Sequence, residues 1–144
     1  VPVCLMHMQG EPRTMQQEPH YGDVVSEVRS FLAERVSACE AGGIARQRLL
    51  LDPGFGFGKT LSHNLSLLKH LQSLNSLGLP LLVGISRKSM IGTLLGGVPV
   101  DQRIHGSVAA AVVAVMQGTA IIRAHDVRET VDALKLVAAV LSAD

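Results

Sequence analysis

Residues 49–59 read LLLDPGFGFGK, in which three apolar residues are followed directly by a carboxylate and by three closely spaced glycines. A short, continuously apolar run that ends in a glycine-rich turn is typical of a strand covered on both faces, as in parallel sheets. Three further runs in the chain have the same character. We therefore expect strands at residues 1–6, 49–51, 79–85 and 120–124.

Helical patterns follow all four runs. Residues 23–41 carry apolar side chains at spacings of three and four, and residues 62–77 carry Leu65, Leu68, Leu71 and Leu74. Residues 107–117 are apolar nearly all round, so we expect a buried helix there. Residues 126–141 begin with Asp126 and Glu129 at the spacing of a capping box, and a short extra helix is expected near residues 89–95.

This alternation of strand and helix predicts an α/β protein with a parallel sheet and right-handed crossovers. Two architectures fit, a complete small doubly wound sheet or half of a (β/α)8 barrel. The sequence opens inside an apolar run without an initiator methionine, so we favour a half barrel of four βα units within a longer protein. In both architectures ligands bind at the carboxyl ends of the strands.

The composition excludes several classes of protein. The 144 residues include 13 basic and 12 acidic side chains, so no basic excess points to nucleic acid or to a membrane surface. Apolar residues make up 47% and charged residues 17%, which excludes a disordered chain. Cys4 and Cys39 lack CxxC spacing and form neither a disulfide framework nor a zinc motif. No membrane-spanning run or secretory signal is visible, and we expect a cytoplasmic location.

Chemically active residues stand at the ends of all four expected strands. They are Met6, His7, Asp52, Phe57, Lys59, Gly84, Ser86, Arg87, Lys88, Ser89, Arg123, Ala124, His125 and Asp126. Because the carboxyl ends of parallel strands meet at one edge, one carboxylate, three cations and an imidazole should converge there. We expect a structural role for His7, and for His125 a structural role and a site role are both open.

The glycine-rich stretch matches neither common phosphate-binding motif. A P-loop needs glycine five residues before Gly58, where Pro53 stands, and the GxGxxG motif fails because the spacing is GxGxG. The glycines instead permit a sharp turn after Asp52 and hold two phenylalanines beside it. The stretch therefore predicts a shaped turn next to a carboxylate.

Asp52 ends an apolar strand, so its carboxylate should be partly desolvated and should need hydrogen-bond donors. Two kinds of donor fit: the N–H groups of a planar heterocycle that contacts Phe57, or a neighbouring Arg or Lys in an ordinary ion pair. Arg87, Lys88 and Arg123 suit an anion such as phosphate. No residues stand at the spacing of a protein-only metal site.

Three strings resemble bacterial dihydropteroate synthases: LLLDPGFGFGK at 49–59, LLVGISRKSMIG at 81–92 and IIRAHDV at 121–127. The opening CLMHMQG at 4–10 is similar to the same family, and the resemblance covers essentially all 144 residues. It implies a (β/α)8 barrel of about twice this length, of which this chain is the C-terminal half, strands five to eight. It also implies that p-aminobenzoate displaces diphosphate from a dihydropterin-methyl diphosphate, which gives dihydropteroate for folate synthesis.

The resemblance implies a role for each matching residue. Asp52 would hold the ring nitrogens of the pterin, in a pocket shaped by Met6, Phe57 and Gly84. Lys88 would reach the pterin and the reacting region. This agrees with the chemistry of the residues themselves, since a carboxylate suits the N–H groups of a planar ring.

The same resemblance places Ser86 and Arg87 on the p-aminobenzoate side, where sulfonamide inhibitors compete. Arg123 and His125, with Ala124 between them, would bind the diphosphate. The expected catalytic residues are Lys88, Arg123 and His125. Groups that stabilise the leaving anion would favour a dissociative step through a cation-like pterin methylene.

Magnesium is implied for the intact enzyme, with its ligand in the half of the family fold that this chain does not contain. The intact enzyme is also expected to be a homodimer without nucleic-acid or membrane partners. Two alternatives stay open: a pterin-binding module of the methyltetrahydrofolate methyltransferase type, which shares Asp52, and a structural half barrel without activity.

Overall fold

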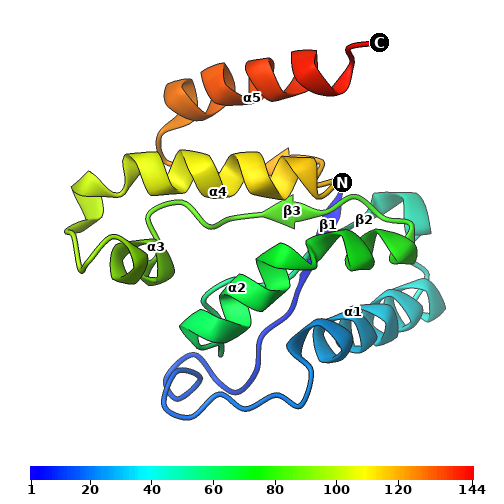
Figure 1. Ribbon diagram of the computed structural model, residues 1–144. Coiled ribbons are helices and arrows are strands. Elements are labelled where there is room, and N and C mark those ends of the chain that lie inside the picture. The colour runs from blue at the N-terminus through cyan, green and yellow to red at the C-terminus, as the bar shows by residue number, and fades with distance from the viewer.

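Short parallel strands alternate with helices in the structure, a computed structural model that describes residues 1–144 (Figure 1). The strands are β1 (Val3–Met6), β2 (Leu49–Asp52), β3 (Leu82–Val83) and β4 (Ile121–Ile122). The α-helices are α1 (Val24–Ala41), α2 (Leu61–Lys69), α3 (Ser89–Leu94), α4 (Ile104–Met116) and α5 (Val127–Leu141). Three 3₁₀ helices are η1 (Arg46–Arg48), η2 (Leu71–Leu77) and η3 (Val100–Gln102). The predicted α/β class is confirmed.

The strands lie side by side in the order of the sequence. β1 and β2 pair in parallel along their whole length, which sets Met6 opposite Asp52. β3 and β4 pair in parallel over two residues, and a parallel bridge between Leu51 and Leu81 joins the two pairs. The third and fourth strands are shorter than the apolar runs predict, because a strand lasts only while its backbone has a partner. All four carboxyl ends lie at one edge.

Helix α1 packs against β1, η1, α2 and η2. Val24, Val28, Leu32 and Val36 are buried there, which confirms the sequence pattern. Burial of each such side chain contributes roughly 1.5–3 kcal/mol. Asp23 caps the helix by accepting the backbone N–H groups of residues 25 and 26.

The leucine-rich helix expected over residues 62–77 is divided into α2 and η2. Leu68, Leu71 and Leu74 are buried as predicted, but Leu65 is 39% exposed. A spacing of three residues matches the 3₁₀ period and drifts around an α-helix of 3.6 residues per turn. Leu65 therefore turns outward within α2, and Leu67 takes the buried position.

The prediction that the helix at 107–117 is buried is wrong for much of α4. Ser107, Ala111 and Ala114 are buried, whereas Val113 is 41% and Met116 is 65% exposed. Helix α5 lies along one side of α4 (Figure 1), so a further side of α4 stays open. None of the α-helices combines the length and the apolar character that crossing a bilayer requires.

The outer strands β1 and β4 each have an exposed face, although their apolar character predicts cover on both faces. In β1, Val3 and Leu5 are half-buried, but Cys4 and Met6 are exposed. Ile121 of β4 is exposed as well. Helix α1 packs on β1, and side chains alternate between the faces of a strand. The uncovered face therefore carries every second side chain of β1.

Candidate functional site

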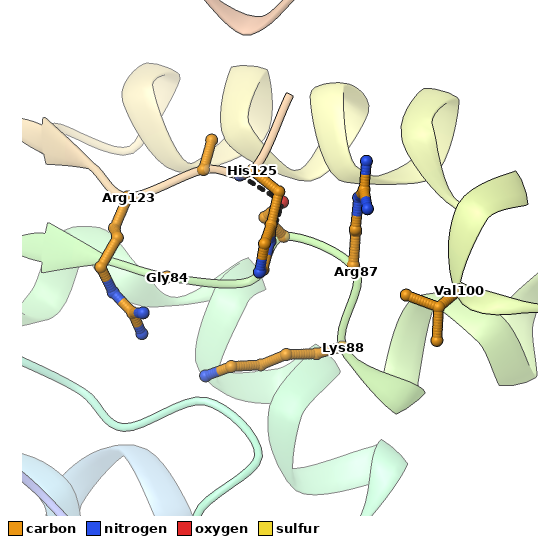
Figure 2. Close-up of a pocket in the computed structure, with 8 residues that line it drawn as sticks. Gly84, Arg87, Lys88, Val100, Arg123 and His125 are labelled. Carbon is orange, nitrogen blue, oxygen red and sulfur yellow. Dashed lines mark hydrogen bonds between the residues drawn. The ribbon is translucent and has the colours of Figure 1, made fainter. Parts of the chain in front are cut away.

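A cavity of about 400 Å³ opens at the carboxyl ends of β3 and β4. Its lining residues are Gly84, Ser86, Arg87, Lys88, Val100, Arg123, Ala124 and His125 (Figure 2). Seven of these eight residues are among those that the sequence predicted. The eighth, Val100 of η3, was missed, because a valine side chain has no charged or reactive group that would mark it in a sequence.

Three nitrogen-bearing side chains enter this cavity from different directions. Figure 2 shows the Arg123 guanidinium, the Lys88 amine and the His125 ring directed into the same space. The Arg123 guanidinium lies against Gly84, where an added Cβ would stand 2.8 Å from Nη2. Glycine at position 84 is therefore needed for Arg123 to adopt this position.

Lys88 connects the cavity to the glycine-rich turn. Its Nζ donates to the backbone carbonyl of Phe55 and lies 4.8 Å from the centre of the Phe57 ring. Burial lowers the pKa of Lys88 to about 8, the Asp52 carboxylate opposes this change, and Arg123 adds to it. The amine thus stands between the cavity and the residues predicted to hold a heterocycle.

Asp52 is buried at the end of β2 and does not line the cavity. Its Oδ1 accepts the backbone N–H of Gly54 at 2.8 Å. Burial raises the pKa of Asp52, and the Gly54 bond and the charges of Lys88, Arg123 and Lys59 offset part of this rise. The ion pairs of the structure do not include Asp52, so the ordinary ion-pair interpretation is wrong.

Lys59 holds the turn that carries Asp52 and Phe57. It is 1% exposed, and its Nζ donates to the carbonyls of Gly54 at 2.8 Å and Phe57 at 3.0 Å. The same Nζ lies 2.9 Å from Nδ1 of His7, so three neighbours match three ammonium donors. Burial lowers the pKa of Lys59 to about 7 and that of His7 to about 4. The structural role predicted for His7 agrees with this contact.

The loop after β1 packs tightly on the same turn. Gly54 has a φ of +72°, and an added Cβ would lie 1.8 Å from the carbonyl oxygen of His7. The Tyr21 hydroxyl donates to the carbonyl of Gly58 at 2.8 Å, and the Gln16 amide bonds both backbone groups of residue 59. The position of the Asp52 turn therefore depends on a loop about 40 residues earlier in the chain.

Arg87 is one of the residues that line the cavity, but its guanidinium is directed away from Lys88 and His125 (Figure 2). The guanidinium binds both oxygens of Asp126, at 2.6 and 3.0 Å. Its charge is therefore paired within the protein, and this geometry does not support Arg87 as an anion ligand. The capping box predicted at Asp126 is also wrong, because Arg87 takes the carboxylate and no cap bond forms.

Ser86 and His125 make a direct contact at the cavity wall. The Ser86 Oγ lies 3.1 Å from the backbone nitrogen of His125 and 3.0 Å from its Nδ1. Met6 and Phe57, by contrast, lie outside the cavity, with Met6 38% exposed opposite Asp52 and Phe57 half-buried beside Lys88. The structure thus gathers seven predicted residues in one cavity and sets Met6, Asp52 and Phe57 beside it.

The arrangement offers two chemical environments next to each other. The cavity contains two cationic groups, Lys88 and Arg123, which suit an anion. Asp52 supplies a desolvated acceptor for N–H donors. The structure contains no group of three His, Cys, Asp or Glu side chains that could hold a metal ion.

The sequence profile of the family of pterin-binding enzymes matches residues 1–125, which include every residue of this site. The chain belongs to the pterin-binding enzyme family. The chain is 59% identical over 143 residues to the dihydropteroate synthase of Escherichia coli strain K12, and the match covers 99% of this chain and 50% of that protein. It spans about half the length of the curated relatives that it matches.

Solved structures of the same family also match this chain. A crystal structure of Yersinia pestis dihydropteroate synthase with a sulfonamide drug complex matches it with a TM-score of 0.98 and 57% identity, over 100% of this chain and 52% of that one. Dihydropteroate synthase from Xanthomonas albilineans in complex with 7,8-dihydropteroate matches with a TM-score of 0.92 and 50% identity. That match covers 100% of this chain and 52% of the other.

Proposed function

We propose that the whole protein is a dihydropteroate synthase that joins p-aminobenzoate to a dihydropterin-methyl diphosphate and releases diphosphate. The observation that carries this proposal is the cavity where Lys88, Arg123 and His125 meet, close to the buried carboxylate of Asp52. The relatives named dihydropteroate synthase, one of them in complex with 7,8-dihydropteroate, support it.

Asp52 holds the pterin in this proposal. Gly54 N–H already occupies Oδ1, which leaves Oδ2 to accept N–H groups from the ring. Such donors would compensate the carboxylate for its loss of water. Met6, Phe57 and Gly84 shape the surrounding pocket, and the half-buried Phe57 ring offers an apolar face to the heterocycle.

Arg123 and His125, with Ala124 between them, hold the diphosphate, and Lys88 stands between that anion and the pterin. In the reaction the bond from the pterin methylene to the diphosphate oxygen breaks. A bond from the amine nitrogen of p-aminobenzoate to the methylene forms, and the amine loses a proton. Cationic groups at the leaving diphosphate stabilise the charge that develops there, which favours a cation-like methylene.

Ser86 and Arg87 border the side of the cavity that we propose for p-aminobenzoate. Sulfonamides would compete at this side, and the Yersinia pestis relative was crystallised with a sulfonamide drug complex. Because Asp126 pairs with the Arg87 guanidinium, Arg87 would contribute its backbone to this wall. No step of the proposal uses magnesium, whose ligand we expect in the half of the barrel that this chain does not contain.

We propose that residues 1–144 form strands five to eight of a (β/α)8 barrel, its C-terminal half. The exposed strand face supports this, because side chains such as Cys4 and Met6 would point into the barrel interior. Exposed apolar residues on α4 and α5, among them Val113 and Leu136, support a homodimer of the whole protein. A cytoplasmic location with small molecules as ligands, and neither nucleic acid nor membrane as partner, completes the proposal.

A chimera tests the proposed activity directly. Residues 1–144 replace the matching half of the Escherichia coli dihydropteroate synthase, to which they are 59% identical. We expect the chimera to form dihydropteroate from both substrates and to be inhibited by a sulfonamide. Residues 1–144 alone should form none, because half of the substrate-holding groups would be missing. A folded chimera without turnover would contradict the proposal.

A second chimera, with Arg123→Met, separates the proposal from its alternative. A pterin-binding module of the methyltetrahydrofolate methyltransferase type would need Asp52 but has no diphosphate to bind. If Arg123→Met leaves the chimera's KM for the diphosphate substrate unchanged, the diphosphate site is wrongly placed.

A further inference from the structure

The hydroxyl of Ser86 contacts His125 at two points, and the donors and acceptors there can be counted. The backbone N–H of His125 can only donate, so it uses one lone pair of the Ser86 oxygen, at 3.1 Å. The hydroxyl hydrogen and a second lone pair remain. Nδ1 of His125 lies 3.0 Å from the same oxygen and must engage one of them.

Only one arrangement uses every group. If Nδ1 carries the ring proton, it donates to the oxygen and the hydroxyl hydrogen loses its nearest acceptor. If Nδ1 is unprotonated, it accepts the hydroxyl hydrogen, and the ring proton of neutral His125 lies on Nε2. The second arrangement satisfies the backbone N–H, the hydroxyl and Nδ1 together.

The position of the ring proton matters because His125 shares the cavity with Arg123 and Lys88 (Figure 2). A protonated Nε2 is a donor that an anion can accept from. An unprotonated Nε2 would present a lone pair to that anion and repel it. The hydroxyl of Ser86 therefore decides whether neutral His125 supports or opposes anion binding.

We propose that Ser86 is a positioning residue that holds neutral His125 with its proton on Nε2, facing the cavity, so that the ring donates to a diphosphate oxygen. This inference rests on the proposed function, because it assumes that the cavity binds diphosphate. It adds a residue that acts on the leaving group through His125. It also gives Ser86 a role on the diphosphate side as well as on the p-aminobenzoate side.

The segment that carries Ser86 is held firmly by the next residue. Arg87 has a left-handed backbone, with φ of 60°, which is strained for a residue with a side chain. Ser107 Oγ accepts its N–H at 2.9 Å, and Arg103 donates to its carbonyl at 2.8 Å. Its guanidinium is fixed to Asp126, the residue after His125. The two segments are thus joined twice, at 86 to 125 and at 87 to 126.

Nuclear magnetic resonance of the ¹⁵N-labelled chain tests the assignment without any enzymatic assay. At about pH 8.5, where histidine rings are neutral, we expect the His125 spectrum to show a protonated Nε2 and an unprotonated Nδ1. Ser86→Ala should populate both tautomers, and Ser86→Thr should restore the wild-type pattern. His105, an exposed histidine on α4, is the control within each spectrum.

Titration with inorganic pyrophosphate then measures the consequence. Ser86→Ala should weaken binding in proportion to the loss of the Nε2-protonated tautomer, about twofold if both tautomers become equally populated, and Ser86→Thr should recover most of it. Ser37→Ala, which removes an exposed hydroxyl from α1, is the matched control and should bind like the wild type.

A wild-type His125 with its proton on Nδ1 would overturn the proposal, and this result does not depend on the folding of any variant. Unchanged pyrophosphate affinity in folded Ser86→Ala would overturn it as well. Failure of the proposed function has a different signature, in which wild-type His125 has the expected tautomer but pyrophosphate does not bind. That outcome removes the diphosphate site and, with it, the action of Ser86 on an anion.

Discussion

The substitution Lys59→Met tests how the buried turn behind the site is stabilised. The Lys59 amine is almost fully buried and contacts the carbonyls of Gly54 and Phe57 and Nδ1 of His7. Methionine has a similar length and removes both the charge and the three polar contacts. The structure predicts that the effect of this change on stability depends strongly on pH.

The direction follows from proton binding. Burial lowers the pKa of Lys59 from its ordinary 10.5 to about 7 in the folded protein. Between these values the unfolded chain keeps the proton while the folded protein releases it, so wild-type stability rises with pH. After release, the neutral amine still donates to both carbonyls, and it can accept a proton from Nδ1 of His7. The contacts therefore persist when the charge is lost.

The magnitude comes from the same pKa difference. A pKa change of one corresponds to about 1.4 kcal/mol, so from pH 7 to pH 9 the wild type should gain about 2–3 kcal/mol over Lys59→Met. At pH 6 the variant loses hydrogen bonds worth about 1–3 kcal/mol each but avoids burying a charge, so the two proteins should differ less.

Urea denaturation at pH 6 and pH 9, followed by circular dichroism, measures the difference in the free energy of unfolding. Lys69→Met removes an exposed lysine from α2 and serves as the control, which should unfold with the wild type at both pH values. An equal difference between wild type and Lys59→Met at the two pH values would refute this reasoning.

Four further substitutions test the site. In the chimera, Asp52→Asn should weaken pterin binding about tenfold by calorimetry, since one ligand N–H would then face an amide donor at a cost of ~1–3 kcal/mol; unchanged affinity would exclude Asp52 as the pterin acceptor. Arg123→Met should weaken pyrophosphate binding by ~1.5–3 kcal/mol and leave the affinity for a bare pterin almost unaffected. Lys88→Met should lower kcat and pterin affinity together. If both variants changed pyrophosphate affinity equally and nothing else, these roles would be contradicted. Gly54→Ala should lower the midpoint of thermal unfolding, because its Cβ would collide with the carbonyl of His7; an unchanged midpoint would mean that the turn can move.

The order of the elements and the residues at the strand ends could be predicted from the sequence, because both depend on local features. Apolar runs, helical periodicity and glycine stops act over a few residues, so α1 and its buried face from Val24 to Val36 were found correctly. Parallel strands bring their carboxyl ends to one edge whatever their neighbours are. Seven lining residues of the cavity could therefore be named in advance.

Only the tertiary structure decided which partner each polar group takes and which apolar face is covered. Arg87 pairs with Asp126 across 39 positions of the chain, and Lys59 meets His7 across 52. Arg87 and Lys59 both have cationic side chains that could bind an anion. Packing alone places Arg87 beside the carboxylate of Asp126 and buries Lys59. Met116 of α4 is exposed for a similar reason, because a residue on a helix is buried only if another element packs against its side of the helix. A sequence specifies the chemistry of each side chain locally, whereas distances between distant residues arise only when the chain folds.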